Sequence, residues 1–115
     1  MQSSKFKDRT VLVTGAGSGI GAKIAEHFGL LGATVAIVDL NNVVLEAKKN
    51  ELLAKGINAL AYCADISNYE SCKKAYAYFY NEIGFIDTLI NNAGISPKHD
   101  GKPYKIWDLP PEEWN

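Results

Sequence analysis

The sequence has no marked excess of charge of either sign, no long apolar run and only two cysteines. Its 12 basic and 13 acidic residues leave a formal net charge of −1, which gives no electrostatic reason to expect a nucleic-acid or anionic-membrane partner. No apolar run approaches the roughly 20 residues that a membrane-spanning helix requires. The N-terminus carries no apolar segment typical of a secretory signal. These absences favour a cytoplasmic protein.

The two cysteines and His99 predict neither a metal site nor a disulfide framework. Cys63 and Cys72 form no C-x-x-C pair, and two cysteines make a poor disulfide framework, so we expect reduced thiols. His99 has no partner at metal-ligand spacing. A chain of 115 residues suits one small domain.

Short apolar runs alternate with segments of helical periodicity along the chain. The apolar runs, which predict strands, are at 10–15, 33–39, 58–65 and 87–94. The helical segments between them are at 19–31, 42–55 and 68–83. Because the strands are continuously apolar rather than alternating, we expect them to be covered on both faces. Strands alternating with helices predict an α/β fold with a parallel sheet.

The connections restrict how these four strands can be arranged. Right-handed crossovers leave few topologies, and we favour the strand order 3-2-1-4, an incomplete Rossmann-type doubly wound sheet. The fourth strand then crosses to the far side of the first. This order creates a topological switch point at the C-terminal ends of strands one and four, where open α/β sheets bind ligands.

A glycine-rich segment, TGAGSGIG at 14–21, lies at the predicted switch point. Gly15 would let the strand turn sharply, Gly19 would let the backbone approach a pyrophosphate, and Gly21 would let the helix pack close to the strand. Free N–H groups at the helix start attract phosphate. A P-loop is excluded because no Gly-Lys-Ser/Thr follows. The alternative, a glycine-rich turn without a ligand, is disfavoured by this concentration of glycines between a strand and a helix.

With Asp39, Asp65 and the sequence NNAG at 91–94, the glycine segment resembles the N-terminal half of a short-chain dehydrogenase/reductase, over nearly the whole chain. The resemblance implies an NAD(P)-dependent oxidoreductase that moves hydride between nicotinamide and a small-molecule alcohol or ketone. It also implies a homo-oligomer for the complete fold. A 3-oxoacyl-carrier-protein reductase-like or a sugar or polyol dehydrogenase-like activity is compatible with it. The alternative is a truncated, non-catalytic dinucleotide-binding module.

Asp39, at the end of the second predicted strand, bears on the choice of cofactor. In a dinucleotide fold an acid there accepts hydrogen bonds from the adenosine ribose hydroxyls, and its charge would repel the 2′-phosphate of NADP. No Arg or Lys lies close in sequence, and Ser18 stands where NADP-preferring relatives often carry Arg. The sequence therefore favours NAD over NADP.

The resemblance extends the cofactor site to residues after the third and fourth strands. Asp65 and Ile66 would meet the adenine, although Asp65 or Ser67 could instead cap the next helix. Asn91 is expected to be structural, with a hydrogen bond across the strands. The complete set expected to bind the cofactor is Gly15, Ser18, Gly19, Ile20, Gly21, Asp39, Asp65, Ile66, Asn92, Ala93 and Gly94.

No catalytic residue is predicted in this chain. Family chemistry requires a Tyr-x-x-x-Lys pair and a Ser that follow NNAG, whereas the one such string here, Tyr69 to Lys73, precedes it on a helix outside the sheet. The segment 107–115 resembles the beginning of the family's fourth helix. We therefore expect residues 1–115 to be the N-terminal part of one NAD-binding Rossmann domain, without its catalytic C-terminal part and inactive alone.

Overall fold

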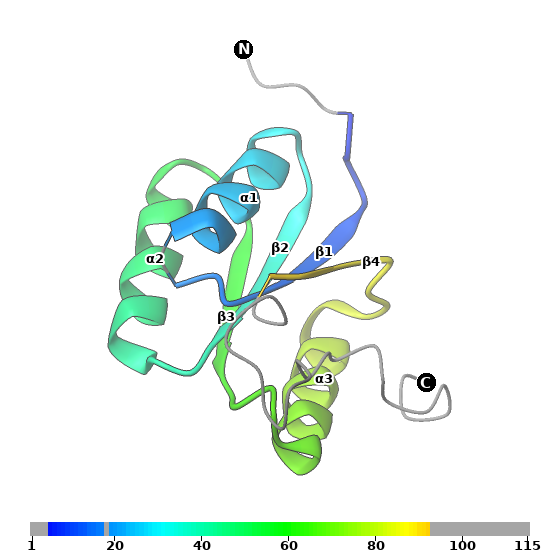
Figure 1. The fold of residues 1–115 in the computed structure, drawn as a ribbon. Helices are drawn as coiled ribbons and strands as arrows, with labels where there is room; N and C mark the ends of the chain where they lie inside the picture. The colour runs from blue at the N-terminus through cyan, green and yellow to red at the C-terminus, as the bar shows by residue number, and fades with distance from the viewer. Residues whose placement is uncertain (1–4, 18, 93–115) are drawn as a thin grey trace.

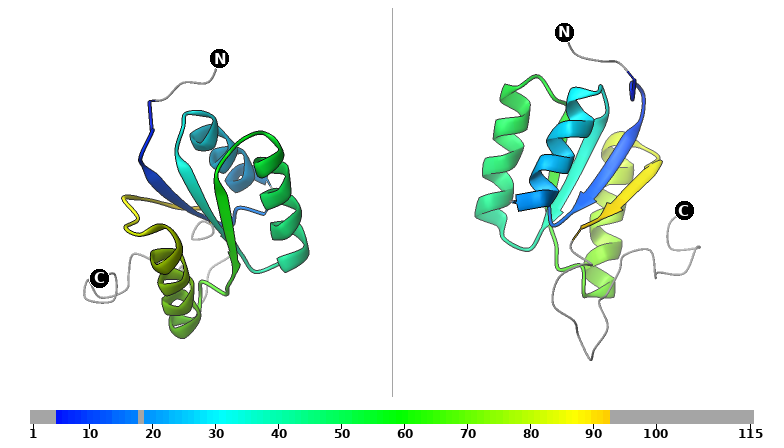
Figure 2. Two further views of the ribbon diagram at one scale, coloured as in Figure 1. Left: turned by 180° about the vertical axis from the view of Figure 1, so that it is seen from behind. Right: turned by 45° about the horizontal axis from the view of Figure 1, so that its top comes forward.

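The computed structural model describes residues 5–17 and 19–92, which form a parallel sheet between two layers of helix (Figures 1 and 2). The elements in chain order are β1 (Thr10–Thr14), α1 (Gly19–Leu30), β2 (Thr34–Asp39), α2 (Asn42–Ala54), β3 (Ala59–Cys63), α3 (Tyr69–Ile83) and β4 (Thr88–Asn91). Every predicted strand and helix is therefore present, within two residues of its predicted start.

The sheet has the strand order β3-β2-β1-β4, and every neighbouring pair is parallel. The predicted order 3-2-1-4 is confirmed. At the C-terminal end of β1, Thr14 is in register with Val38 of β2 on one side and with Asn91 of β4 on the other. The chain leaves β1 towards β2 and returns from β3 to β4, so the switch point lies between β1 and β4, as predicted.

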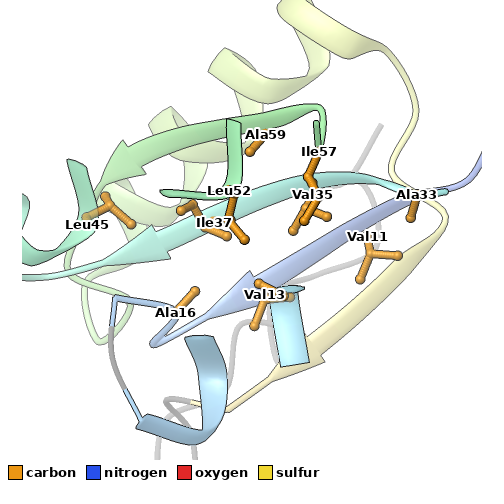
Figure 3. Close-up of a cluster of buried hydrophobic side chains, with 11 residues drawn as sticks. Val11, Val13, Ala16, Ala33, Val35, Ile37, Leu45, Leu52, Ile57 and Ala59 are labelled. Atoms are coloured by element: carbon orange, nitrogen blue, oxygen red, sulfur yellow. The ribbon is translucent and has the colours of Figure 1, made fainter. Parts of the chain in front are cut away.

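Helices cover both faces of the sheet, and successive strand residues, which point to opposite sides, contribute to two separate core clusters. Val13 and Ile37 belong to a core cluster with residues of α1 and α2 (Figure 3). Leu12 and Val38 pack on the other side, against α3. A right-handed crossover that reverses direction along the sheet must lie on the opposite face, which accounts for the separation of α3 from α1 and α2 (Figure 2).

Strand β4 is held against β1 at both ends. At the N-terminal end, Asp87 Oδ2 accepts a hydrogen bond from the Thr10 N–H at 2.9 Å. At the C-terminal end, the buried Thr14 Oγ1 donates to Asn91 Oδ1 at 2.8 Å. Asn91 thus forms the hydrogen bond across the strands that the sequence led us to expect. These two contacts fix where the C-terminal end of β4 lies beside the glycine segment.

The residue that caps the N-terminus of α3 is not one of the two that the sequence suggested. Asn68, rather than Asp65 or Ser67, is the N-cap, and its Oδ1 accepts from the Ser71 N–H at 2.9 Å. The helix begins at Tyr69, so only the residue directly before it can reach the free N–H groups of the first turn. Asp65 instead accepts from the N–H and the hydroxyl of Ser67, at 3.0 and 2.6 Å. Strand β3 consequently ends at Cys63, before this turn.

Among the described residues, Phe79 is the largest fully buried side chain, and it anchors α3 to the sheet. We expect Phe79→Ala to lower the free energy of unfolding by about 3–5 kcal/mol, because the lost burial is compounded by a cavity. Phe85 provides the matched control, since 71% of its surface is exposed, and its replacement by alanine is expected to change stability by about 0.5 kcal/mol or less. Urea unfolding followed by circular dichroism measures both; similar losses in the two variants would contradict the observed packing of α3.

Candidate functional site

The glycine segment connects the C-terminal end of β1 to the N-terminus of α1. Gly15 and Gly19 have φ angles of +63° and +62°, a left-handed conformation that glycine adopts without the steric cost of a Cβ atom. The sharp turn predicted at Gly15 is present. Apart from Gly19 itself, its chain neighbours and the backbone of its own helix, no described heavy atom lies within 4 Å of the position that a Gly19 Cβ would occupy. The backbone at the start of α1 is therefore open to a ligand on that side.

Gly21 brings the first turn of α1 directly against the end of β1. A Cβ atom built at Gly21 would overlap the carbonyl oxygen of Gly15 and would lie 2.8 Å from Asn92 Nδ2. The close helix–strand packing predicted at Gly21 is thus observed. It places the N-terminus of α1, with its partial positive charge, beside the switch point.

Asn92 joins the end of β4 to the same loop. Its Nδ2 donates a hydrogen bond to the Gly15 carbonyl oxygen at 3.3 Å, just beyond the C-terminal ends of the paired strands β1 and β4. This contact brings the predicted ligand-binding residue after β4 next to the predicted phosphate loop. Three other predicted site residues, Ser18, Ala93 and Gly94, lie outside the described residues.

Asp39 at the end of β2 faces the glycine segment. Its Oδ2 accepts a hydrogen bond from the Gly17 N–H at 2.8 Å, and its Oδ1 accepts from the Asn41 N–H at 3.1 Å. Asp39 makes no ion pair with any described residue; the carboxylates that do so are those of Glu26, Glu46, Glu51 and Asp87. Among the described residues, no cationic side chain therefore forms an ion pair with this half-buried carboxylate.

The segment after β3 lies beside Asp39, on the side of the sheet away from β4. The Ala64 N–H donates to the Asp39 carbonyl oxygen at 3.1 Å, which brings Asp65 and Ile66 to the same edge of the sheet. Asp65 is exposed and bonded to Ser67, whereas the half-buried Ile66 packs against the α3-side core cluster. Of the two, Asp65 is the more accessible to a ligand.

Two residues near the C-terminal end of β2 were absent from the predicted set of cofactor-binding residues: Gly17 and Leu40. Gly17 is the hydrogen-bond donor to Asp39. Leu40, the residue after Asp39, has 68% of its surface exposed, and Ile20 at the start of α1 has 69% exposed. Glycines at alternate positions of TGAGSGIG are a sequence signal for Gly17. Only the fold, however, shows that Asp39 is its partner.

The Tyr69–Lys73 pair lies on α3, the helix that covers the face opposite to α1. Lys73 Nζ lies 5.5 Å from the centroid of the Tyr69 ring, a cation–π contact. The two side chains therefore have a structural contact with each other, and the interpretation of this string as a coincidence stays a prediction.

Residues 5–17 and 19–92 provide neither a metal site nor a membrane-spanning helix. These residues contain no group of three or more His, Cys, Asp or Glu side chains that could hold a metal ion. None of their helices is long and apolar enough to cross a bilayer.

Both cysteines are free thiols, and burial raises the pKa of Cys72 to about 11, so this thiol stays protonated at neutral pH.

Known proteins resemble this chain over most of its length. The family model described as short chain dehydrogenase matches residues 9–115. A CLA biosynthesis dehydrogenase/reductase of Lactiplantibacillus plantarum is 37% identical over 95% of this chain, which corresponds to 36% of that protein. The chain thus spans little more than a third of the length of this relative.

Solved structures give the same result. A citronellol catabolism dehydrogenase of Pseudomonas aeruginosa PAO1 superposes with a TM-score of 0.78 and 36% identity, over 84% of this chain and 41% of the other. A short chain dehydrogenase/reductase from Burkholderia phymatum, solved in complex with NAD, has a TM-score of 0.71 and 26% identity, over 74% and 30% of the two chains. The described residues therefore share the Rossmann-type fold of these enzymes.

Proposed function

Because the chain belongs to the short chain dehydrogenase family, we propose that it is the cofactor-binding part of an oxidoreductase that acts on a small-molecule alcohol or ketone. The observation that carries this proposal is the convergence of the glycine segment, Asp39 and Asn92 at the switch point between β1 and β4. This is where doubly wound sheets bind dinucleotides.

The residues present fit a nicotinamide dinucleotide. The open position beside Gly19 and the N-terminus of α1 would accept the pyrophosphate. Asp39 would accept hydrogen bonds from the adenosine ribose, and Asp65 would lie towards the adenine. The predicted contributions of Gly15, Ser18, Ile20, Gly21, Ile66, Asn92, Ala93 and Gly94 remain part of the proposal. When bound, the nicotinamide supplies or accepts the hydride.

The cofactor we propose is NAD rather than NADP. A 2′-phosphate would approach the Asp39 carboxylate, which has no ion-pair partner among the described residues, and like charges at such close range repel. Both carboxylate oxygens already accept one hydrogen bond each and retain lone pairs for ribose hydroxyls. The solved relative in complex with NAD supports this choice.

Several finer predictions extend this proposal. The substrate classes that we retain are 3-oxoacyl-carrier-protein reductase-like and sugar or polyol dehydrogenase-like, and we expect a homo-oligomer in the cytoplasm. The second candidate function is a truncated, non-catalytic dinucleotide-binding module. Either function requires dinucleotide binding.

Thermal melting of the chain with added NAD or NADP tests the proposal. We expect NAD to raise the melting temperature, since a ligand at about 100 times its Kd stabilises a folded protein by about 2.7 kcal/mol, and we expect a smaller rise with NADP. Tyr69→Phe is the matched control, expected to melt with the same NAD-dependent rise. An unchanged melting temperature with NAD, NADH and NADP would refute the proposal. A rise that is lost in Tyr69→Phe would refute the structural interpretation of that tyrosine.

A further inference from the structure

Gly17 is buried, and its backbone contacts the carboxylate of Asp39 directly. A Cβ atom built at Gly17 would lie 2.9 Å from Asp39 Oδ2 and 3.0 Å from Val44 Cγ1. Real Cβ atoms have almost no contacts shorter than 3.0 Å, so the contact with Asp39 Oδ2 could not persist without a shift. Gly17 thus leaves just enough room for its N–H to reach the carboxylate at 2.8 Å.

The backbone conformation at Gly17 does not itself require glycine. Unlike Gly15 and Gly19, Gly17 is not in the left-handed region. Alanine would therefore bring no backbone strain of the kind expected at those two positions. What glycine provides here is space, and the space is filled by the side chain of Asp39.

If position 17 carried a side chain, the neighbouring group that could move most easily is the Asp39 carboxylate. It stands at the end of a side chain with two rotatable bonds, whereas Val44 is stiff at χ1 and lies in the first turn of α2. Two backbone N–H groups, those of Gly17 and Asn41, fix the carboxylate orientation. A methyl group at position 17 would push Oδ2 away and disturb the first of these bonds.

We propose that Gly17 is a positioning residue for cofactor selectivity: it holds the Asp39 carboxylate in the orientation that accepts the adenosine ribose hydroxyls and opposes a 2′-phosphate. This inference rests on the proposed function, because it requires that Asp39 meets the ribose. In this proposal Gly17, which has no side chain, affects the cofactor only through the Asp39 carboxylate.

Gly17→Ala is therefore expected to weaken NAD binding about 5- to 10-fold, less than the loss of a whole hydrogen bond to a charged group, because the contact is weakened and not removed. NADP binding should change less than twofold, so the NAD-to-NADP affinity ratio falls. The Kd values for both cofactors are measured by isothermal titration calorimetry. Gly56→Ala is the matched control: Gly56 has a φ of +81° with open space around its Cβ position, so this change should reduce stability and leave the affinity ratio unchanged.

A double-mutant cycle tests whether Gly17 acts through Asp39. In the Asp39→Ala background, a further Gly17→Ala change is expected to alter NAD affinity less than twofold, because the displaced carboxylate is no longer there. Additive losses would overturn the inference, as would equal weakening of NAD and NADP by Gly17→Ala. Loss of folding in Gly17→Ala would also overturn it, since the carboxylate is the group expected to move. Absence of NAD binding by the unmodified chain would instead refute the proposed function.

Discussion

Gly21→Ala is expected to lower the free energy of unfolding by about 3 kcal/mol, near the upper end of the usual cost of overpacking. The added methyl group would overlap the Gly15 carbonyl oxygen. That oxygen belongs to the backbone and also accepts a hydrogen bond from Asn92 Nδ2, so it cannot rotate away as a side chain could. Relief would require α1 to move from β1, which would disturb the cores on which both elements pack.

Gly19→Ala is the matched control for this prediction, because it makes the same chemical change two residues earlier. Apart from its chain neighbours and its own helix backbone, no described atom lies within 4 Å of a Gly19 Cβ, but the φ of +62° would strain an alanine, at a cost of roughly 1–2 kcal/mol. Urea unfolding of both variants and the unmodified chain measures the difference. If Gly21→Ala lowers the free energy of unfolding no more than Gly19→Ala does, the result would contradict the close packing of α1 against β1.

Asp39→Ala is expected to weaken NAD binding by about 10- to 100-fold, the range for lost hydrogen bonds to a charged group. NADP binding should weaken less or improve, because removal of the carboxylate also removes its repulsion of a 2′-phosphate. The selectivity between the two cofactors should therefore fall or reverse. Calorimetric Kd values for NAD and NADP measure this change directly.

Glu46→Ala is the control for the change in net charge. Glu46 lies on α2 and pairs with Lys49 at 2.9 Å, so its removal also raises the net charge by one without touching Asp39. We expect both cofactor affinities to stay within about twofold, as is usual for an exposed ion pair on a helix. An equal loss of NAD affinity in Asp39→Ala and Glu46→Ala would show that Asp39 acts through net charge and does not meet the ribose.

Most of the fold could be predicted from the sequence because its signals are local. Continuously apolar runs such as 33–39 identify buried strands, and helical periodicity identifies what lies between them. The rule of right-handed crossovers then converts element order into strand order. The predicted strand ends were less accurate: the third strand ends at Cys63 rather than Asp65, because Asp65 bonds to Ser67 in a turn whose geometry the apolar pattern does not encode.

The sequence by itself therefore determined the α/β class, the strand order and the place of the candidate site, since each depends on patterns along the chain. Only the tertiary structure decided which groups meet there. The Thr14–Asn91 hydrogen bond spans 77 positions, and the Gly17–Asp39 bond spans 22. Such pairs depend on the register between strands and the direction of each side chain. For Asp39 this means that two backbone N–H groups, rather than its own sequence neighbours alone, fix the orientation in which it can meet a cofactor.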